Sequence, residues 1–179
     1  MNYNTLAKEI YEANKAVGWW DDPDRCKLTL LQLVSTEIAE ATEAERKDLM
    51  DDHLPHRKGG EVELADAMIR LLDMAGAFGW EYDIGLEDYG TLKRTEKVGS
   101  IAGKHAMLNV LVSSLVINAY RDNDSDTNEM YTKLLNCICS VARSQGYDLE
   151  GALREKLAYN AKRQDHKRET RAAEGGKKF

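Results

Sequence analysis

Two pairs of carboxylates stand at a spacing that places the members of each pair side by side on a helix. Glu37 and Glu40 form the first pair, and Glu63 and Asp66 form the second. Side chains three residues apart lie on the same face of an α-helix. Carboxylate oxygens are the ligands that Mg²⁺ and Mn²⁺ prefer. The pattern predicts a divalent metal site at these four residues.

The first pair is predicted to face the core. At about 100° per residue, Glu37 and Glu40 fall among Leu30, Leu33 and Val34 on the helical wheel. A buried carboxylate is costly unless a cation accompanies it. The second pair is less clear, because Glu63 lies at the edge of its apolar arc and Asp66 lies beyond it, where Asp66 could also pair with Arg70.

Two other interpretations of the carboxylates exist: the first stays open, and the sequence argues against the second. Both pairs could be solvated charges on an acid-rich protein. A di-iron bundle also uses inward carboxylates, but it requires Glu-x-x-His on two helices. No histidine of this chain has a glutamate three residues before it. The pattern therefore favours a site of hard oxygen ligands over a di-iron site.

A basic stripe follows near the end of the chain. Lys156, Asn160, Arg163 and Lys167 would lie along one side of a helix predicted over 149–173. Two kinds of cation and an amide in a row suit a polyphosphate, since arginine can bind phosphate oxygens bidentately and lysine adds a point charge. Acidic residues are interspersed along this helix, so a solvated face with salt bridges remains the alternative.

Two residues near the N-terminus are candidates for contacting a nucleobase. Trp20 could stack on a base, although core packing is the commoner use of a tryptophan. Asn14 could hydrogen-bond a base edge, and a role at the end of its helix is the alternative. Both are candidate substrate-binding residues, together with Lys156, Asn160 and Arg163.

The elements that must position these side chains are helical. With only two prolines and no run that alternates like a half-buried strand, the chain is predicted to form one all-α domain over 1–179, a bundle of about six helices without significant β-sheet. We find no internal repeat, and the tail after about residue 174 is expected to fray. The expected helices cover 2–16, 24–50, 61–78, a short stretch around 86–97, 101–120, 127–145 and 149–173.

Composition narrows the class of function. The net charge is −6, opposite in sign to that of a generic nucleic-acid binder, so a nucleic-acid partner is not expected. An acidic protein that binds a polyphosphate needs metal cations. The cysteines Cys26, Cys137 and Cys139 are expected to be buried and reduced. No secretion signal and no membrane-spanning apolar stretch is apparent, which favours a cytoplasmic protein without a membrane partner.

These features together resemble the MazG-like all-α NTP pyrophosphohydrolases, including their phage-encoded branch. The resemblance rests on Glu37-Ile38-Ala39-Glu40, on Glu63-Leu64-Ala65-Asp66 and on the segment from Lys156 to Arg163. Thr36 stands where many relatives carry the first glutamate of the motif EExxE. No general base is therefore assigned.

The resemblance implies a metal-dependent hydrolysis. Nucleoside triphosphates, canonical or modified and with a purine such as dGTP as the first to test, would give a monophosphate and pyrophosphate. Glu37, Glu40, Glu63 and Asp66 would hold Mg²⁺ or Mn²⁺ and would act in catalysis through a water that the metal activates. Lys156, Asn160 and Arg163 would hold the triphosphate. The resemblance also implies a homo-oligomer, either a dimer or a tetramer, in the cytoplasm of a bacterial or phage-infected cell.

Two alternatives belong to other classes of protein. A non-enzymatic, oligomeric helical interaction module would have no Mg²⁺-dependent turnover. A helical nucleic-acid binder would use the basic stripe, and its binding would depend on salt but not on Glu37.

Overall fold

The protein is an all-α bundle, as the sequence predicted. The computed structural model describes residues 1–86, 89–166 and 168–172, and these form eight α-helices, one short 3₁₀-helix and no strand, apart from one isolated bridge between Met50 and Lys58. The tail expected to fray after residue 174 lies outside the described residues. The helices are α1 (Tyr3–Ala16), α2 (Lys27–Lys47), α3 (Gly59–Phe78), α4 (Tyr89–Lys97), α5 (Ile101–Tyr120), α6 (Asp124–Ser144), α7 (Leu149–Asn160) and α8 (Arg168–Ala172), with η1 (Gln164–His166) between the last two.

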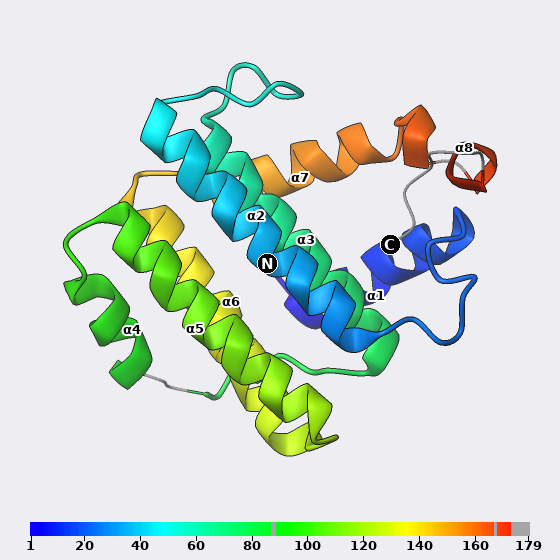
Figure 1. The fold of residues 1–179 in the computed structure, drawn as a ribbon, viewed down its shortest axis with the longest axis horizontal. Helices are drawn as coiled ribbons and strands as arrows, with labels where there is room; N and C mark the ends of the chain where they lie inside the picture. The colour runs from blue at the N-terminus through cyan, green and yellow to red at the C-terminus, as the bar shows by residue number, and fades with distance from the viewer. Residues whose placement is uncertain (87–88, 167, 173–179) are drawn as a thin grey trace.

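Two helical hairpins form the centre of the bundle. The hairpin of α2 and α3 packs against the hairpin of α5 and α6 chiefly through α2 and α5 (Figure 1). Helix α3 is the most deeply buried element, because α1, α2 and α7 all pack on it. Each hairpin is followed by a helix that crosses to the other hairpin: α4 packs on α6, and α7 packs on α3.

Helices α3 and α6 occupy equivalent places in their hairpins. Gly79 follows α3 with φ +71° and Gly146 follows α6 two residues after its end with φ +74°, a left-handed backbone that glycine adopts without strain. Counted back from these glycines, seven pairs of equivalent positions in the middle and later turns of the two helices are buried in both. The matching pairs are Leu64 and Tyr131, Ala65 and Thr132, Ala67 and Leu134, Met68 and Leu135, Leu71 and Ile138, Met74 and Val141, and Ala75 and Ala142.

Helices α2 and α5 match in the same way. The comparison shows that the carboxylates occur in the first hairpin and not at the equivalent positions of the second. Buried positions of α2 correspond to buried positions of α5 in the pairs Leu31 and His105, Val34 and Leu108, Glu37 and Leu111, Ile38 and Val112, and Ala41 and Leu115. The second hairpin thus has Leu111 in place of Glu37, and by the register of α3 and α6 it has Met130 and Lys133 in place of Glu63 and Asp66. The sequence showed no repeat because what the hairpins share is burial, not residue identity. The hairpin architecture itself does not require acidic residues at these places.

Several helix boundaries differ from the predictions. Helix α2 ends at Lys47, where Asp48 adopts φ +52° and closes the helix, and it begins at Lys27 instead of 24. The helix predicted over 149–173 is broken, because α7 ends at Asn160 and a turn leads into η1. The charged segment after Asn160 contains no apolar stripe that could hold it against the bundle, so a continuous helix gains little from packing there.

The sequence analysis expected no apolar stretch long enough to span a membrane, and helix α5 contradicts that expectation by its length and composition. Among the described residues it is the one helix whose length and hydropathy, 1.2 over an 18-residue window, would allow it to cross a membrane. In the bundle it packs on α2 and α6, and 28% of that window is buried. The core helix of a globular bundle meets the same criterion.

The contact between α1 and α3 depends on a small residue. A Cβ added at Gly76 would overlap the carbonyl oxygen of Ala7 and the Cβ of Tyr11. We therefore expect Gly76→Ala to push α1 away from α3 and to lower the free energy of unfolding by about 1–3 kcal/mol. Urea denaturation measures the change. Gly99→Ala is the control, because no atom lies near its added Cβ, and equal stability of the two variants would contradict the close packing.

Candidate metal and nucleotide site

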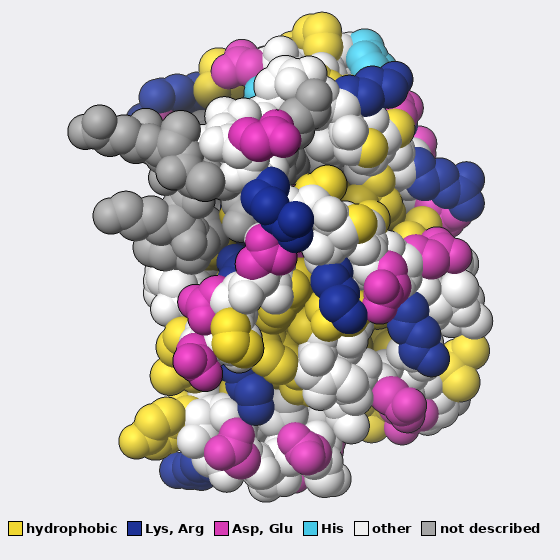
Figure 2. All heavy atoms as spheres, turned by 90° about the vertical axis from the view of Figure 1, so that its right-hand side faces the viewer, with side chains coloured by type: hydrophobic (Ala, Val, Ile, Leu, Met, Phe, Trp, Pro, Cys, Tyr) yellow, Lys and Arg dark blue, Asp and Glu magenta, His cyan; other side chains and the backbone are white. Residues whose placement is uncertain are grey.

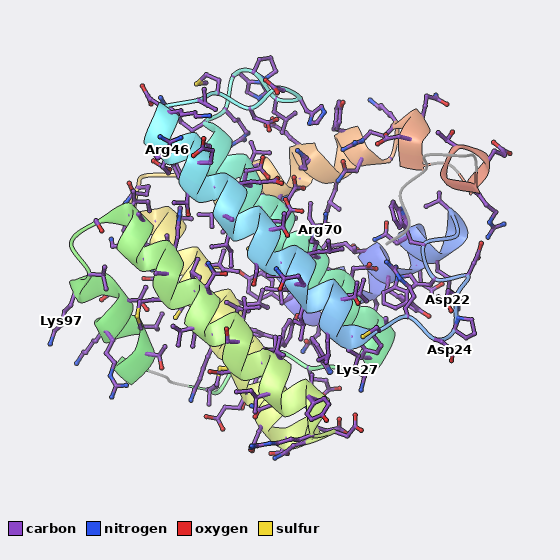
Figure 3. The ribbon with its side chains drawn as sticks, in the orientation of Figure 1. Asp22, Asp24, Lys27, Arg46, Arg70 and Lys97 are labelled. Carbon is purple, nitrogen blue, oxygen red and sulfur yellow. The ribbon has the colours of Figure 1, made fainter. Side chains whose placement is uncertain are left out.

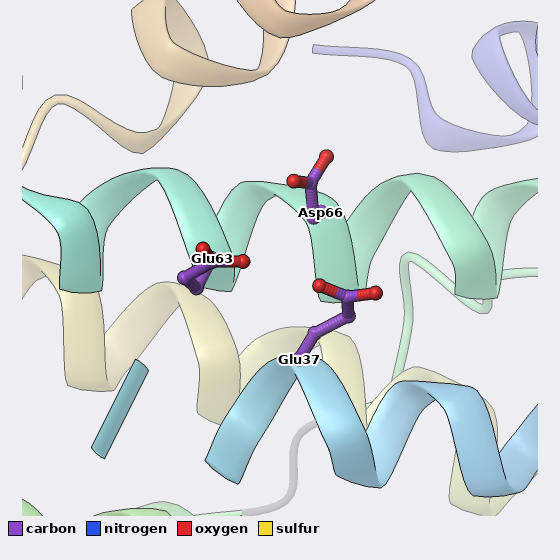
Figure 4. A group of neighbouring side chains, drawn as sticks. All are labelled: Glu37, Glu63 and Asp66. Atoms are coloured by element: carbon purple, nitrogen blue, oxygen red, sulfur yellow. The ribbon is translucent and has the colours of Figure 1, made fainter. Parts of the chain in front are cut away.

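Three of the four predicted carboxylates converge. Glu37 comes from α2, and Glu63 and Asp66 come from α3, and one oxygen from each lies within 4.8 Å of the others (Figure 4). Glu37 is buried and the other two are half-buried. Both α3 residues were predicted at or beyond the edge of an apolar face. They are nevertheless partly enclosed, because α2 and α7 pack on either side of that edge.

Glu40 does not face the core, and that prediction was wrong. Its side chain is exposed. The buried arc of α2 is centred toward Leu31 and Ile38, on the far side of Glu37 from Glu40, whereas the prediction had counted half-buried Leu33 as a core position. Glu40 still lies close enough for partial burial and the charge of Glu37 to raise its pKa. It stands at the rim of the carboxylate group.

Two cations compensate part of the negative charge. The Lys156 ammonium lies 2.9 Å from Asp66 Oδ2 and 3.9 Å from Asp51 Oδ2, and Lys156 is buried. The Arg70 guanidinium donates from Nε to Glu37 Oε1 at 2.5 Å, and Arg70 lies near the middle of the molecule beside α2 and α3 (Figure 3). Arg70 thus binds Glu37, and the partner of Asp66 is Lys156, a residue that comes from the other end of the chain.

The carboxylates raise one another's pKa. Burial, then repulsion from Asp66 and Glu37, raises the pKa of Glu63 to about 9. Burial raises the pKa of Asp66 to about 6, although Lys156 acts in the opposite direction. Two cations face four carboxylates when Glu40 is included, so the group retains unbalanced negative charge. Without a metal ion, protonation of Glu63 relieves the repulsion among these carboxylates. A bound divalent cation would relieve the same repulsion by neutralising their charge.

The remaining residues of the predicted basic stripe are separated by the end of α7. Asn160 is the last residue of α7, one turn beyond Lys156, and its Oδ1 is buried without a hydrogen-bond partner among the described residues. Arg163 lies after the helix, where it binds Asp165 through two hydrogen bonds of 2.9 and 2.6 Å. Lys167 lies outside the described residues. The structure therefore brings Lys156 to the carboxylates, but it does not form the predicted row of free cations.

Asn14 and Trp20 meet at a residue that the sequence analysis did not consider. Trp20 Nε1 donates to Asp73 Oδ1 at 3.0 Å, and the Asn14 side chain also hydrogen-bonds Asp73. The Arg25 guanidinium carbon lies 4.8 Å from the centroid of the Trp20 ring, on its face. Trp20 is therefore engaged through its N–H and over one face of its ring, and its predicted stacking on a base has little room on that face.

The loop between α2 and α3 positions Lys156, a role that the sequence did not predict. Arg57, which lies between α2 and α3, binds Glu155 at 2.8 and 3.1 Å and Glu61 at 3.0 Å. Glu155 immediately precedes Lys156, so this contact fixes the register of α7 on α3. Asp51, the second partner of Lys156, accepts backbone hydrogen bonds within the same loop. The charges of a loop do not indicate which distant residues they will pair with. Asp73, in contrast, could have been predicted from the sequence, because it lies on the same side of its helix as Asp66 and Arg70.

Other predictions for single residues had mixed outcomes. Cys137 is buried and Cys139 half-buried, but Cys26 is exposed because it caps the start of α2. None of the three forms a disulfide bond within the described part of the chain. The face of the molecule on the right of Figure 1 carries acidic and basic side chains interspersed with hydrophobic ones (Figure 2). That face does not form the continuous basic surface that a nucleic-acid backbone requires.

Comparison of the chain with protein-family models, with curated proteins and with solved structures finds no match.

The raised pKa values predict how the stability of the metal-free protein depends on pH. A carboxyl group with a higher pKa in the folded state than in the unfolded state binds its proton more tightly when folded. Stability is therefore lost as pH rises from the ordinary range of a glutamate, about 4.3, through the folded pKa of Glu63 at about 9. We expect Glu63→Gln to remove this loss and to make the protein more stable than the wild type at pH 8, by about 1–2 kcal/mol after allowance for solvent screening.

Urea denaturation in the presence of a chelator, at pH 5, 7 and 9, measures this effect. Glu43→Gln on α2 is the control, because Glu43 is paired with Arg46 and that hydrogen bond lowers its pKa to about 2. If Glu63→Gln and Glu43→Gln follow the same pH profile, Glu63 is not under the repulsion described here.

Proposed function

We propose that the protein hydrolyses nucleoside triphosphates or deoxynucleoside triphosphates to the monophosphate and pyrophosphate, with Mg²⁺ or Mn²⁺. The observation that carries the proposal is the convergence of Glu37, Glu63 and Asp66 to within 4.8 Å. The resemblance of the carboxylate and Lys156–Arg163 motifs to the MazG-like pyrophosphohydrolases supports the same reaction. A non-enzymatic interaction module remains the alternative, and assembly as a homo-oligomer remains part of the proposal.

The contrast between the two hairpins supports a functional role for the carboxylates. The equivalent places in the second hairpin hold Leu111, Met130 and Lys133. A hairpin of this architecture therefore packs without acidic residues there. Placing three carboxylates close together costs free energy, and the second hairpin packs without such a group.

The residues present fit a hard divalent cation. The donor set is carboxylate oxygen throughout, which suits Mg²⁺ or Mn²⁺ and not Zn²⁺. Glu37, Glu63 and Asp66 would hold the ion, with Glu40 at the rim. When bound, the ion would lower the pKa of a water and neutralise phosphate charge.

The protein's own side chains would orient the site. Arg70 holds Glu37 in one position, and Lys156 holds Asp66. Because Lys156 is buried between Asp66 and Asp51, it acts chiefly on these carboxylates, and Arg163 would reach a phosphate only by leaving Asp165. Water would add to the α-phosphorus, the bond from that phosphorus to the bridging oxygen would break, and pyrophosphate would leave. The unpartnered Oδ1 of Asn160 could accept a hydrogen bond from a substrate hydroxyl or a water.

The first test is a panel of NTPs and dNTPs with Mg²⁺ or Mn²⁺, scored for pyrophosphate. We expect turnover, and we expect Glu63→Gln and Asp66→Asn each to lower it at least about 100-fold. Glu43→Gln is the control, because Glu43 is exposed on α2 and pairs with Arg46. A wild-type protein that releases no pyrophosphate from any nucleotide would exclude the proposed reaction.

A second test distinguishes the proposed metal ligands Glu37 and Glu63 from Glu40, which lies beside them. Mn²⁺ binding, followed by electron paramagnetic resonance, should weaken at least about tenfold in Glu37→Gln and in Glu63→Gln. Glu40→Gln should change the affinity less than either, because its side chain is exposed and outside the group of converging oxygens. A loss in Glu40→Gln as large as that in Glu63→Gln would restore Glu40 as a direct ligand.

A further inference from the structure

A stripe of polar residues runs along α3, a helix that is otherwise almost entirely buried. Glu63, Asp66, Arg70 and Asp73 follow one another at spacings of three, four and three residues, so they lie on one side of the helix. Glu63 and Asp66, which belong to the converging carboxylates, are at one end of the stripe, and Asp73 is at the other end. Seven residues separate Asp66 from Asp73, which is about 10 Å along the helix axis. A sugar and a purine together span a length of this order.

Asp73 is held in place by neighbours that belong to a different part of the chain. Trp20 donates its ring N–H to Asp73 Oδ1, and the Asn14 side chain adds a second hydrogen bond. Trp20 is itself fixed by edge contacts with Tyr11 and Phe78, at 5.6 Å between ring centroids in each case. The position of the carboxylate is thus determined before any ligand arrives.

The carboxylate keeps capacity to accept further hydrogen bonds. A carboxylate offers about four lone-pair positions, and Trp20 and Asn14 account for two. Burial raises the pKa of Asp73 to about 6, while Trp20, Asn14 and the arginines Arg25 and Arg70 oppose that shift. Above this pH the group is an acceptor on both oxygens. Asp73 is half-buried, not enclosed.

We propose that Asp73 reads the nucleobase of the substrate and selects a base with two adjacent N–H donors. Guanine meets this requirement, because its ring N1–H and its 2-amino group point the same way and can donate to the two carboxylate oxygens. Adenine and cytosine offer an amino group next to a ring acceptor. Thymine and uracil offer one N–H flanked by two carbonyl oxygens, which a carboxylate repels. The inference rests on the proposed function, and it assigns Trp20 and Asn14 as positioning residues.

The test changes the donor pattern of this one side chain. Asp73→Asn keeps the size but replaces one acceptor by a donor. We expect kcat/KM for dGTP to fall about 10- to 100-fold, as for loss of a bidentate base contact. We expect dXTP, in which a carbonyl oxygen replaces the 2-amino group, to improve relative to dGTP. Thermal unfolding of each variant checks that the fold is kept.

Binding of the products gives a readout that does not require turnover. Calorimetry should show that the wild type binds dGMP more tightly than dTMP, and that Asp73→Asn loses this difference. Trp20→Phe keeps an aromatic ring but removes the N–H, so it should narrow the preference for dGMP over dTMP without reversing it. Asp124→Asn, at the exposed start of α6, is the control and should leave the ranking of bases unchanged.

The outcomes separate this inference from the proposed function. If the wild type hydrolyses no nucleotide, the proposed function fails. If the wild type hydrolyses nucleotides and Asp73→Asn keeps the ranking of bases, the base-reading role of Asp73 is overturned alone. An equal loss for all bases would also overturn it, because that result is expected of a carboxylate that only braces Trp20 against α3.

Discussion

The mutual repulsion of Glu37, Glu63 and Asp66 is the constraint on which the architecture around the site depends. Three carboxylates with oxygens within 4.8 Å are unstable together unless cations are supplied. Arg70 is supplied from α3 itself. Lys156 has to be brought from α7. The position of α7 is therefore as much a part of the carboxylate site as the two helices that carry the acids.

The crossing of α7 onto α3 follows from the arrangement of the two hairpins. Each hairpin is followed by a helix that packs on the other one, so the cation for the first hairpin comes from the segment after the second. The Arg57 loop fixes this crossing, because it binds Glu155 beside Lys156 and also Glu61 at the start of α3. Stability of the bundle and electrostatic balance of the site are thus achieved by the same contacts.

The comparison of the hairpins also separates folding from function. Many of their buried positions coincide along α3 and α6 and along α2 and α5. Only the first hairpin carries acidic residues where the second has Leu111, Met130 and Lys133. The second hairpin packs with these three residues, so the hairpin architecture does not require acidic residues at these positions. The polar stripe extends from this set along α3 to Asp73.

The sequence by itself determined the all-α class and most helix boundaries, because apolar periodicity and glycine stops act over a few residues. It also identified Glu37, Glu63 and Asp66, since spacing on a helix is local. Only the tertiary structure decided that Glu40 is exposed, because the centre of a buried arc is fixed by the helices packed against it. Only the tertiary structure paired Lys156 with Asp66, and Trp20 and Asn14 with Asp73. Those partners are far apart in the chain, and no local pattern encodes which charges the packing of helices will bring together.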